Sequence, residues 1–306
     1  MSAYSHDILL EAASQIAGTQ NYPDATLYLV PTPIGNLADI TFRALHVLQL
    51  ADAIACEDTR NTRLLLSHYG ITSKTLFALH QHNEQYATAE LLRRLQQGER
   101  IALVTDAGTP AISDPGARAV AAVSHAGLRI VALPGASSVI TALSAAGITE
   151  GDVLFHGFLP TKAQERQHCL TELIALPHAV VLLEAPHRIE TLAQELAQLA
   201  PARTVTLARE LTKQFEQIVT YPAEHLPTWL QQRPEHKKGE FVCIIHPPAA
   251  ETASDAEAHD DALTLALAHM PTKAAAQLIA RLTGQPKNKL YERALQLKKS
   301  NPPADA

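Results

Sequence analysis

Three loops combine glycine with small residues in a way that is typical of a site holding a small ligand against the backbone. They are PTPIGN at Pro31–Asn36, DAGTPAISDPG at Asp106–Gly116 and PGASS at Pro134–Ser138. Small side chains let a ligand approach main-chain N–H and C=O groups closely. Each loop alone reads more simply as an ordinary strand-to-helix turn. Their occurrence at three equivalent places predicts one small-molecule site built from all three.

Charged residues that can move protons or bind phosphates follow several other predicted strands. They form the clusters EDTR at Glu57–Arg60, EAPHR at Glu184–Arg188 and RELTK at Arg209–Lys213, and Asp106 and Asp114 lie in the second loop. Carboxylates serve as general bases, and Arg and Lys side chains hold phosphates. Each cluster taken singly is explained equally well by a helix cap or a surface ion pair. Their repetition at strand ends in two domains favours a cleft between those domains.

The elements that must position these residues alternate between strands and helices from residue 27 onward. The three loops follow apolar runs at Leu27–Val30, Ile101–Thr105 and Arg129–Leu133. Alternating strands and helices predict a mostly parallel sheet covered by helices on both faces. In such open α/β sheets, ligands bind outside the carboxyl ends of the strands.

A second pattern begins near residue 147, where strand candidates follow one another without long helices between the last of them. These candidates lie at residues 153–156, 180–184, 204–209, 215–221 and 240–246. Strands joined by short connections pair antiparallel. We therefore predict a second, smaller α/β domain with mixed strand directions.

The whole chain of 306 residues divides, on this reading, into five segments. The segments are a flexible extension (1–25), an N-terminal α/β domain (26–146), a second α/β domain (147–248), an acidic linker (249–262) and a C-terminal basic helical unit resembling a helix-turn-helix (263–306). The linker is predicted because residues 247–262 hold five acids and no Lys or Arg.

The C-terminal unit carries seven basic residues against one glutamate between Thr272 and residue 299. Thr272 is a candidate helix cap, Gly284 a helix end and Pro286 the start of the next helix. A compact basic helical unit predicts that this part of the chain binds nucleic-acid phosphates. The alternative is a basic amphipathic tail that docks on its own protein.

Composition and missing motifs exclude several classes of function. The formal charge of −6 is not that of a generic nucleic-acid binder, and the three cysteines form no C-x-x-C pair. No apolar run reaches the length of a membrane span, so we expect a cytoplasmic protein. The P-loop, the G-x-G-x-x-G loop, H-E-x-x-H and G-x-S-x-G are absent, and no residues show metal-ligand spacing. We expect no metal.

The motifs, in their order along the chain, resemble the tetrapyrrole methylase superfamily of S-adenosylmethionine (SAM) methyltransferases. The resemblance is closest to its RNA branch, which methylates the ribose 2′-hydroxyl of small-subunit ribosomal RNA. It is carried by LYLVPTPIGNLADIT, ACEDTRNTRLLL, LVTDAGTPAISDPGA, LPGASSVITAL, FHGFLP, LEAPHRI, ARELTKQFEQI, GEFVCII, PTKAAAQLIARLTG and KNKLYERAL. It covers about residues 27–300.

The resemblance implies an α/β fold of two domains with SAM in the cleft between them, a small C-terminal helical unit and a homodimer. The residues that it assigns to the cofactor lie in the three loops and at the strand ends of the second domain. They are Pro33, Ile34, Gly35, Asn36, Asp106, Ala107, Gly108, Ser113, Asp114, Pro115, Gly116, Ser137, Phe158, Leu159, Pro160, Glu184, Ala185 and Arg209.

A ribose hydroxyl becomes a good nucleophile only when a base takes its proton. Glu57 and Asp58 are the favoured catalytic candidates, with Asp106 and Glu210 also open. Lys213 serves as a base only if its surroundings depress its pKa, and otherwise contacts phosphate. The residues expected to bind RNA are Arg60, Arg63, His187, Arg188, Lys273, Arg281, Lys287, Lys289 and Arg293.

The resulting hypothesis is SAM-dependent 2′-O-methylation of a cytidine in the decoding region of small-subunit (16S) rRNA, within the assembled 30S subunit. A tetrapyrrole carbon methyltransferase is the related alternative, although that activity does not call for a basic helical tail. A SAM-binding or RNA-binding module without catalysis, such as an assembly factor, is the alternative from another class.

Overall fold

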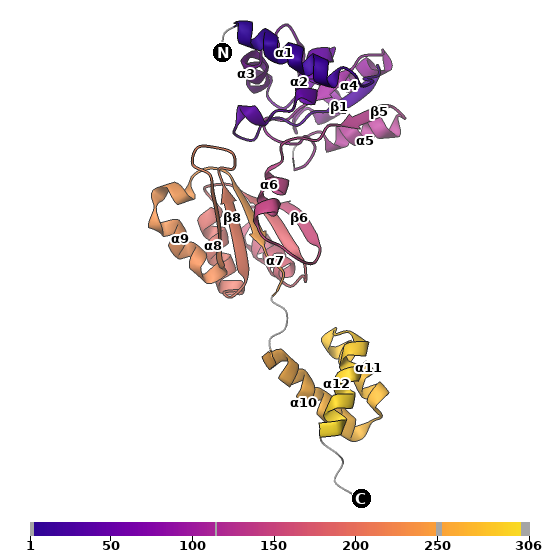
Figure 1. The fold of residues 1–306 in the computed structure, drawn as a ribbon, viewed down its shortest axis with the longest axis vertical. Helices are drawn as coiled ribbons and strands as arrows, with labels where there is room; N and C mark the ends of the chain where they lie inside the picture. Colours follow the sequence, from indigo (N-terminus) through magenta and orange to yellow (C-terminus); the bar gives the residue numbers. More distant parts are fainter. Residues whose placement is uncertain (1–2, 114, 249–252, 301–306) are drawn as a thin grey trace, which may run out of the picture. The chain divides into compact units, whose positions relative to one another are not determined.

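The structure, a computed structural model, describes residues 3–113, 115–248 and 253–300. It divides into two compact units, residues 1–247 and residues 248–306, and each is described by itself. The first unit contains two five-stranded sheets, and the second is helical (Figure 1).

The first sheet is entirely parallel, with the strand order β3-β2-β4-β1-β5. Its elements are α1 (Ala3–Ala17), β1 (Thr26–Leu29), η1 (Leu37–Asp39), α2 (Phe42–Leu50), β2 (Ala53–Cys56), α3 (Thr59–His68), β3 (Thr75–Ala78), α4 (Glu84–Gln96), β4 (Ile101–Leu103), α5 (Ala117–His125) and β5 (Arg129–Ala132). This confirms the predicted parallel sheet.

Helices cover both faces of this sheet because side chains of a strand alternate between its two faces. Tyr28 and Ile54 pack under α1, α2 and α3, whereas Leu27, Ala53 and Ala55 pack under α4 and α5. The central strands β2, β4 and β1 are therefore buried on both sides, which explains their nearly continuous apolar sequence, whereas the edge strands β3 and β5 are only partly buried.

The second sheet has the order β6-β7-β10-β8-β9 and mixed strand directions, as the sequence predicted. Only the β6–β7 pair is parallel. Its elements are α6 (Ser138–Ala145), β6 (Val153–Phe158), α7 (Ala163–Ile174), β7 (Ala179–Glu184), α8 (Ile189–Leu199), β8 (Thr204–Arg209), β9 (Gln217–Pro222), η2 (Ala223–His225), α9 (Leu226–Gln232), η3 (Pro234–Lys237) and β10 (Phe241–Ile245).

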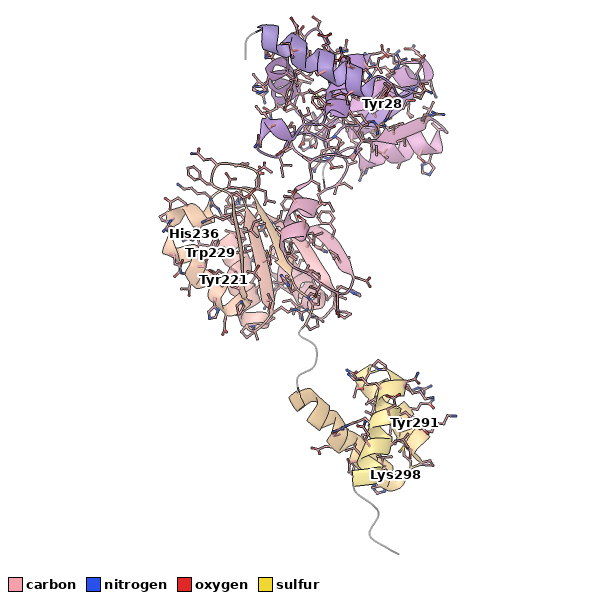
Figure 2. The ribbon with its side chains drawn as sticks, in the orientation of Figure 1. Tyr28, Tyr221, Trp229, His236, Tyr291 and Lys298 are labelled. Carbon is pink, nitrogen blue, oxygen red and sulfur yellow. The ribbon has the colours of Figure 1, made fainter. Side chains whose placement is uncertain are left out.

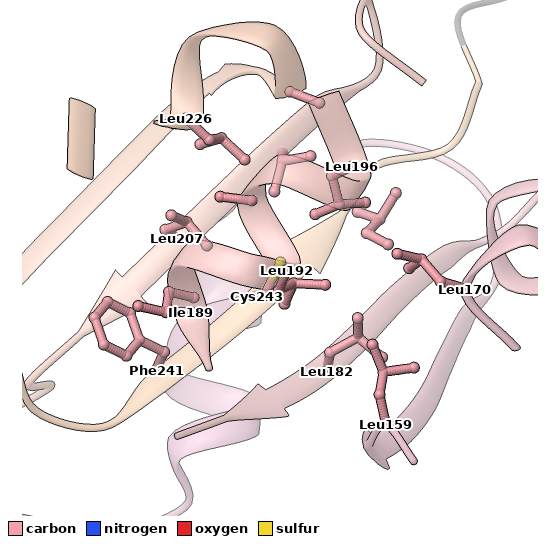
Figure 3. Close-up of a cluster of buried hydrophobic side chains, with 14 of the residues drawn as sticks. Leu159, Leu170, Leu182, Ile189, Leu192, Leu196, Leu207, Leu226, Phe241 and Cys243 are labelled. Carbon is pink, nitrogen blue, oxygen red and sulfur yellow. The ribbon is translucent and has the colours of Figure 1, made fainter. Parts of the chain in front are cut away.

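One face of the second sheet forms a core with α7, α8 and α9. Figure 3 shows this cluster, in which Leu182, Leu207 and Cys243 from neighbouring strands meet Ile189 and Leu192 from α8. The opposite face packs against α6, and Ile34 from the first loop joins the same cluster. This contact attaches the first half of the unit to the second sheet.

The N-terminal segment corrects one prediction. The sequence predicted a flexible extension over residues 1–25, but residues 3–17 form α1, which packs against α2. Ala13 and Tyr22 are buried in the core of the first sheet, with Leu9 and Leu10 packed beside them. The Tyr22 hydroxyl donates to the Ala17 carbonyl at 3.0 Å and holds the end of the helix. An apolar face at helical spacing therefore anchors this segment.

The second unit consists of α10 (Ala253–His269), α11 (Thr272–Thr283) and α12 (Lys287–Ser300). Leu263, Ala276, Ile279 and Ala294 are among the residues of its small apolar core. Residues 249–252 of the predicted linker lie outside the described residues, and from Ala253 onward the predicted linker is helical instead. Gly284 ends α11 in the left-handed conformation, as its sequence position predicted.

Candidate active site

The three loops meet at the carboxyl edge of the first sheet through hydrogen bonds that cross between them. Thr32 and Gly108 exchange two backbone hydrogen bonds of 2.9 Å. The Thr109 hydroxyl donates to the Ala136 carbonyl at 3.1 Å, which ties the second loop to the third. The loops therefore form one wall, as their common position after strands predicted.

This wall and the second sheet enclose a cavity of about 370 Å³. That volume lies in the range of small-molecule sites. Its lining comes from both halves of the unit: Ile34, Glu57, Thr105, Asp106, Ala107, Gly108, Thr109, Ile112, Ser137, Ser138, Val139, Phe155, Phe158, Leu183, Glu184, Ala185, Pro186, Ala208, Leu211, Glu240, Phe241 and Val242.

The charges of this lining are all of one sign. Glu57, Asp106, Glu184 and Glu240 contribute carboxylates, and no Lys or Arg among the described residues belongs to the lining. Apolar side chains cover much of the remaining wall. A cavity of this kind suits a ligand that is partly apolar and carries positive charge. SAM has this chemistry, because it combines an adenine ring with a sulfonium and an ammonium group.

Glu184 supplies an independent sign of a missing ligand partner. It is 3% exposed, and its Oε1 accepts from the Ala185 amide at 2.8 Å. Its Oε2 is buried without a hydrogen-bond partner in the described part of the chain. Burial raises the pKa of Glu184, and the hydrogen bond from the Ala185 amide and the charge of Arg188 lower it by less. Buried oxygens are nearly always hydrogen-bonded, so a donor on a bound ligand fits this atom.

Two hydrogen bonds orient carboxylates on the side of the cavity that belongs to the first sheet. The Thr105 hydroxyl donates to Glu57 Oε2 at 3.3 Å, and Asn61 Nδ2 donates to Asp106 Oδ2 at 2.8 Å. Asn61 comes from the first turn of α3, which begins directly after the Glu57–Asp58 pair. The start of this helix therefore sets the orientation of Asp106 as well as the position of Glu57.

Asp58 has a different environment from its neighbour Glu57. Its side chain accepts from the Arg60 amide at 2.7 Å as the N-cap of α3 and forms an ion pair with the Arg60 guanidinium. Hydrogen bonds from the Arg60 side chain and backbone lower the pKa of Asp58 to about 2. Asp58 is absent from the cavity lining. A carboxylate engaged in this way is a weak base, so Glu57 is the better-placed member of the pair.

Lys213 is held as a cation by two carboxylates. Its Nζ lies 2.9 Å from Glu210 Oε1 and 3.4 Å from Glu240 Oε2. Burial lowers the pKa of Lys213, but the hydrogen bond to Glu210 and the charge of Glu240 outweigh burial and raise it overall. The surroundings therefore favour the protonated ammonium, which is unsuited to take a proton.

The loop that carries Lys213, residues 210–216, is strained and tightly held. Glu210 has φ 50° and Thr212 has φ 65°, a region that residues other than glycine seldom occupy. Glu216 Oε2 accepts from the Thr212 amide at 2.5 Å, and Glu210 Oε1 accepts from the Glu240 amide at 3.2 Å. Strain of this kind persists only where surrounding contacts enforce it, and it concentrates at functional sites.

A family model for tetrapyrrole (corrin/porphyrin) methylases matches residues 26–227, which span both sheets and the loops of the cavity. The chain belongs to the tetrapyrrole methylase family. A second model, described as the RsmI C-terminal HTH domain, matches residues 252–298 of the helical unit.

Several curated relatives match nearly the whole chain. Proteins named "Ribosomal RNA small subunit methyltransferase I" from Escherichia coli O157:H7 and Vibrio cholerae are 48% and 47% identical, each covering 88% of this chain and 94% of the relative. The protein of that name from Neisseria meningitidis serogroup B is 42% identical, covering 89% of this chain and 94% of the relative.

Solved structures share the fold at low identity. A diphthine synthase matches with a TM-score of 0.55 and 15% identity, covering 74% of this chain and 91% of that chain. A cobalt precorrin-4 methyltransferase matches with a TM-score of 0.53 and 18% identity, covering 72% of this chain and 94% of that chain. These matches confirm the predicted two-domain fold of the tetrapyrrole methylase family.

The cofactor residues carried over from the family divide into three groups in the structure. Those that line the cavity are Ile34, Asp106, Ala107, Gly108, Ser137, Phe158, Glu184 and Ala185. Those that do not line it are Pro33, Gly35, Asn36, Ser113, Pro115, Gly116, Leu159, Pro160 and Arg209. Asp114 lies outside the described residues.

Some residues outside the lining support the wall instead. A side chain at Gly35 would collide with Lys213 and Thr212, so this glycine permits the close contact of two loops. The Gly116 amide donates to Glu84 Oε1 at 3.2 Å, which anchors the end of the second loop to α4. Leu159 belongs to the core of the second sheet, and the carbonyls of Leu159 and Pro160 accept from Arg188.

The predicted RNA-binding residues differ in their availability. Arg188 is engaged inside the second half, where it also lies 3.1 Å from Glu184. Arg293 forms an ion pair with Asp260 at 2.5 Å, which joins α12 to α10. The remaining members of the set have exposed side chains: Arg60, Arg63, His187, Lys273, Arg281, Lys287 and Lys289. Arg60 is exposed but paired with Asp58.

Several lining residues belong to the loops and strand-end clusters that the sequence pointed to, although they were not assigned to the cofactor: Thr109, Ile112, Ser138, Pro186, Leu211 and Glu240. The lining residues that sequence reasoning missed are Thr105, Val139, Phe155, Leu183, Ala208, Phe241 and Val242. Many are apolar strand residues whose sequence resembles any buried strand. Alternation along β7, β8 and β10 was the available signal, because Leu183, Ala208 and Val242 share one face.

Among the described residues, no group of three His, Cys, Asp or Glu side chains is arranged to hold a metal ion. Within the same residues, no helix is both long and apolar enough to cross a membrane.

Proposed function

We propose that this protein transfers the methyl group of SAM to the ribose 2′-hydroxyl of a cytidine in the decoding region of small-subunit (16S) rRNA. Methylation of small-subunit rRNA is supported by relatives of that name at 42–48% identity over nearly their full length. The observation that carries the assignment is the carboxylate-lined cavity at the junction of the three loops and the second sheet.

The four carboxylates of the cavity lining are the groups that attract the cationic cofactor. When bound, SAM supplies an electrophilic methyl group on a positively charged sulfur. Ile34, Ala208 and Leu211 provide an apolar wall, and the buried, unpaired Oε2 of Glu184 accepts a donor from the ligand. An apolar wall lowers the local dielectric constant and so strengthens the electrostatic attraction.

Glu57 is the proposed general base for the ribose hydroxyl. It lines the cavity, and the Thr105 hydroxyl orients its carboxylate. Its neighbour Asp58 is engaged as a helix cap with a pKa of about 2, and Lys213 is held protonated. A positioned base contributes about 10²- to 10⁴-fold to the rate. Asp106 is the second carboxylate on the first-sheet side of the cavity, and Asn61 Nδ2 donates a hydrogen bond to it at 2.8 Å.

We propose that the helical unit binds the RNA substrate. Lys273, Arg281, Lys287 and Lys289 expose their side chains on α11 and α12. Exposed cations bind RNA phosphates and release counterions, so binding should weaken steeply with salt. The match to a helix-turn-helix domain model supports this role. Within the cytoplasm, the proposed substrate is the assembled 30S subunit.

We also propose that the protein is a homodimer, as the family resemblance implies. Strand β6 lies at one edge of the second sheet and exposes Val153 by 44% and Leu154 by 37%. An uncovered edge strand with apolar side chains is typical of a surface that a partner covers. Sedimentation equilibrium of the wild type and of Val153→Lys tests it: the wild type should be dimeric and the variant mostly monomeric. A monomeric wild type would refute the dimer.

A tetrapyrrole carbon methyltransferase remains the alternative within the family. Truncation after Pro247 discriminates the two, because this is where the structure divides into its units. If RNA is the substrate, the truncated protein should bind SAM as the full chain does but lose methylation of small subunits. Unchanged methylation of a tetrapyrrole by both forms would favour the alternative. SAM binding with transfer to neither substrate would favour a module without catalysis.

A further inference from the structure

A second cavity of about 660 Å³ lies beside the 210–216 loop, apart from the proposed methyl-transfer site. Its walls are the β8–β9 connection and the segment around η3. The lining consists of Arg209, Glu210, Gln214, Phe215, Glu216, Gln217, Arg233, Glu235, His236 and Lys238.

The buried guanidinium of Arg209 holds the two walls of this cavity together. Arg209 is 4% exposed; its Nε donates to the Lys238 carbonyl at 3.2 Å, and its Nη1 donates to the Phe215 carbonyl at 3.2 Å and to Gln217 at 2.6 Å. Among the described residues, Nη2 of Arg209 has no hydrogen-bond partner and no carboxylate forms an ion pair with its guanidinium. A buried arginine with a free donor at a cavity is suited to bind an anion.

Two further cations stand at the rim. Arg233 and Lys238 are exposed, and neither forms a side-chain hydrogen bond or ion pair with another described residue. Lys237, between them in the chain, is paired with Glu190 at 2.6 Å and does not line the cavity. The free cations at this rim therefore have no internal partner.

The three carboxylates of the lining oppose these cations only in part. Glu210 is engaged by Lys213 and the Glu240 amide, and Glu216 accepts from the Thr212 amide. Glu235 is the one lining carboxylate without a side-chain partner among the described residues. Lys213 neutralises Glu210, whereas the Thr212 amide leaves the charge of Glu216 in place. Arg209, Arg233 and Lys238 therefore face two uncompensated carboxylates, Glu216 and Glu235, and the balance favours an anionic ligand.

The walls also offer a surface for an aromatic base. Phe215 is 68% exposed at the cavity. His236, which also lines the cavity, stacks on Trp229 with ring centroids 4.2 Å apart, and its Nδ1 lies 2.8 Å from the Trp229 carbonyl oxygen; Figure 2 labels both residues. Cations combined with an exposed aromatic ring are the elements that bind single-stranded nucleic acid.

The two cavities lie at the same end of β8 and share its following loop. Ala208 and Leu211 line the first, and Arg209 and Glu210 line the second. Consecutive strand residues point to opposite faces of a sheet, so the two linings lie on the two sides of one edge.

We propose that this second cavity binds the phosphodiester backbone of the RNA strand next to the methylated nucleotide, through Arg209, Arg233 and Lys238. The site rests on the proposed function, since it gives the rRNA substrate a second point of contact on the catalytic unit. Arg209 forms its floor, the two exposed cations contact the phosphate from the rim, and Phe215 stacks on a neighbouring base.

The test uses the full chain and small ribosomal subunits that lack the methyl group. The double variant Arg233→Ala/Lys238→Ala removes two exposed cations without touching the core. We expect its KM for the subunits to rise about tenfold, and the salt dependence of kcat/KM to become shallower by about 1.4 in log–log slope. SAM affinity, measured by calorimetry, should stay that of the wild type. Phe215→Ala should also raise KM, and Phe215→Tyr should restore it.

Lys237→Ala is the matched control, because it removes one positive charge from the same segment outside the cavity. Because the control removes one charge and the double variant removes two, a general field would change log KM and the salt slope of the control by about half as much as those of the double variant. A change of that size or larger in the control would show that the site is wrong. A second outcome would also refute the proposal. If inorganic phosphate raises the melting temperature of the wild type but not of Arg233→Ala/Lys238→Ala, while the double variant and Lys237→Ala methylate subunits as well as the wild type does, the ligand of this cavity is free phosphate. A wild type that methylates no RNA refutes the proposed function itself, whichever variant is compared.

Discussion

The backbone amide of Asn36 donates a 3.0 Å hydrogen bond to the side-chain hydroxyl of Thr212, 176 residues further along the chain. The first residue ends a loop of the parallel sheet, and the second lies in the strained 210–216 loop of the mixed sheet. The bond joins the two halves of the unit next to Ile34 and Leu211, which line the cavity. Together with the packing of Ile34 against the second sheet, this bond links the two walls of the proposed SAM site.

Thr212→Val should weaken SAM binding about threefold to tenfold. Valine keeps the β-branched shape but removes the oxygen that accepts from Asn36, and a neutral hydrogen bond contributes about 0.5–1.5 kcal/mol. Titration calorimetry with SAM measures the change. Thr220→Val is the control, because it removes a hydroxyl from β9 that pairs with Thr206 away from the cavity. Equal affinities for SAM in the wild type and Thr212→Val would contradict the role of this bond.

Glu57→Gln and Asp58→Asn should separate the roles of two successive carboxylates. Glu57→Gln is expected to lower kcat by about 10²- to 10⁴-fold, because it removes the proposed base from the cavity. Asp58→Asn should keep turnover within a few fold of the wild type, since asparagine also caps helices well. Single-turnover methyl transfer to small subunits measures both. Full turnover in both variants, or an equal loss in both, would refute the assignment.

The low pKa of Asp58 predicts how its contribution to stability depends on pH. The Arg60 contacts lower the pKa from its ordinary value of 3.8 to about 2 in the folded protein. A carboxyl with a depressed folded-state pKa stabilises the protein above the unfolded-state value, and this stabilisation is lost as the pH falls through the folded-state value. The wild type should therefore melt at a higher temperature than Asp58→Ala at pH 5–7.

The difference in melting temperature between the wild type and Asp58→Ala should narrow steadily as the pH falls from about 4 towards 2. Thermal unfolding followed by circular dichroism over this range measures it. The difference in melting temperature between Asp58→Asn and Asp58→Ala should depend less on pH than the difference between the wild type and Asp58→Ala, because asparagine caps the helix without titrating. A gap that widens on acidification would contradict the ion-pair geometry.

The basic residues of the helical unit should have two different roles, RNA binding and stabilisation of the unit. Lys287→Ala/Lys289→Ala removes exposed charges, so KM for small subunits should rise and the salt slope should decrease by about 2 at most. Arg293→Ala should instead destabilise the unit, because it breaks the contact between Arg293 and Asp260. Hydrogen exchange of α10 and α12 measures this loss of stability. Identical behaviour of the two variants in both measurements would contradict the distinction.

Much of the fold could be predicted because its strands are short apolar runs separated by helices with glycine ends. The exceptions were the part of α10 that was predicted as a linker and α1, whose apolar residues Leu9, Leu10, Ala13 and Ala17 form a face only once the helix is assumed. Nothing in the local sequence indicates that this face packs on α2. The second sheet followed from strands joined without long helices, and its antiparallel pairs confirm that reasoning.

The candidate site was predictable at the level of loops but not of single side chains. Glu57 and Asp58 are adjacent and chemically similar, and only the start of α3 decides which one becomes a helix cap. Arg209 follows Ala208 in β8, yet it lines the other cavity because strand residues alternate. Charge alone likewise did not reveal that Arg188 and Arg293 have internal partners, since pairing depends on residues distant in sequence.

Transfer of labelled methyl from SAM to small ribosomal subunits, followed by alkaline hydrolysis, tests the central proposal most directly. A 2′-O-methyl group protects the adjacent phosphodiester, so the label should appear in alkali-resistant dinucleotides, and free rRNA in parallel shows which substrate form is preferred. Full-chain protein should place the label there, and Glu57→Gln should not. Tight SAM binding by the wild type with no label in RNA would contradict the proposal and favour the tetrapyrrole enzyme or the non-catalytic module.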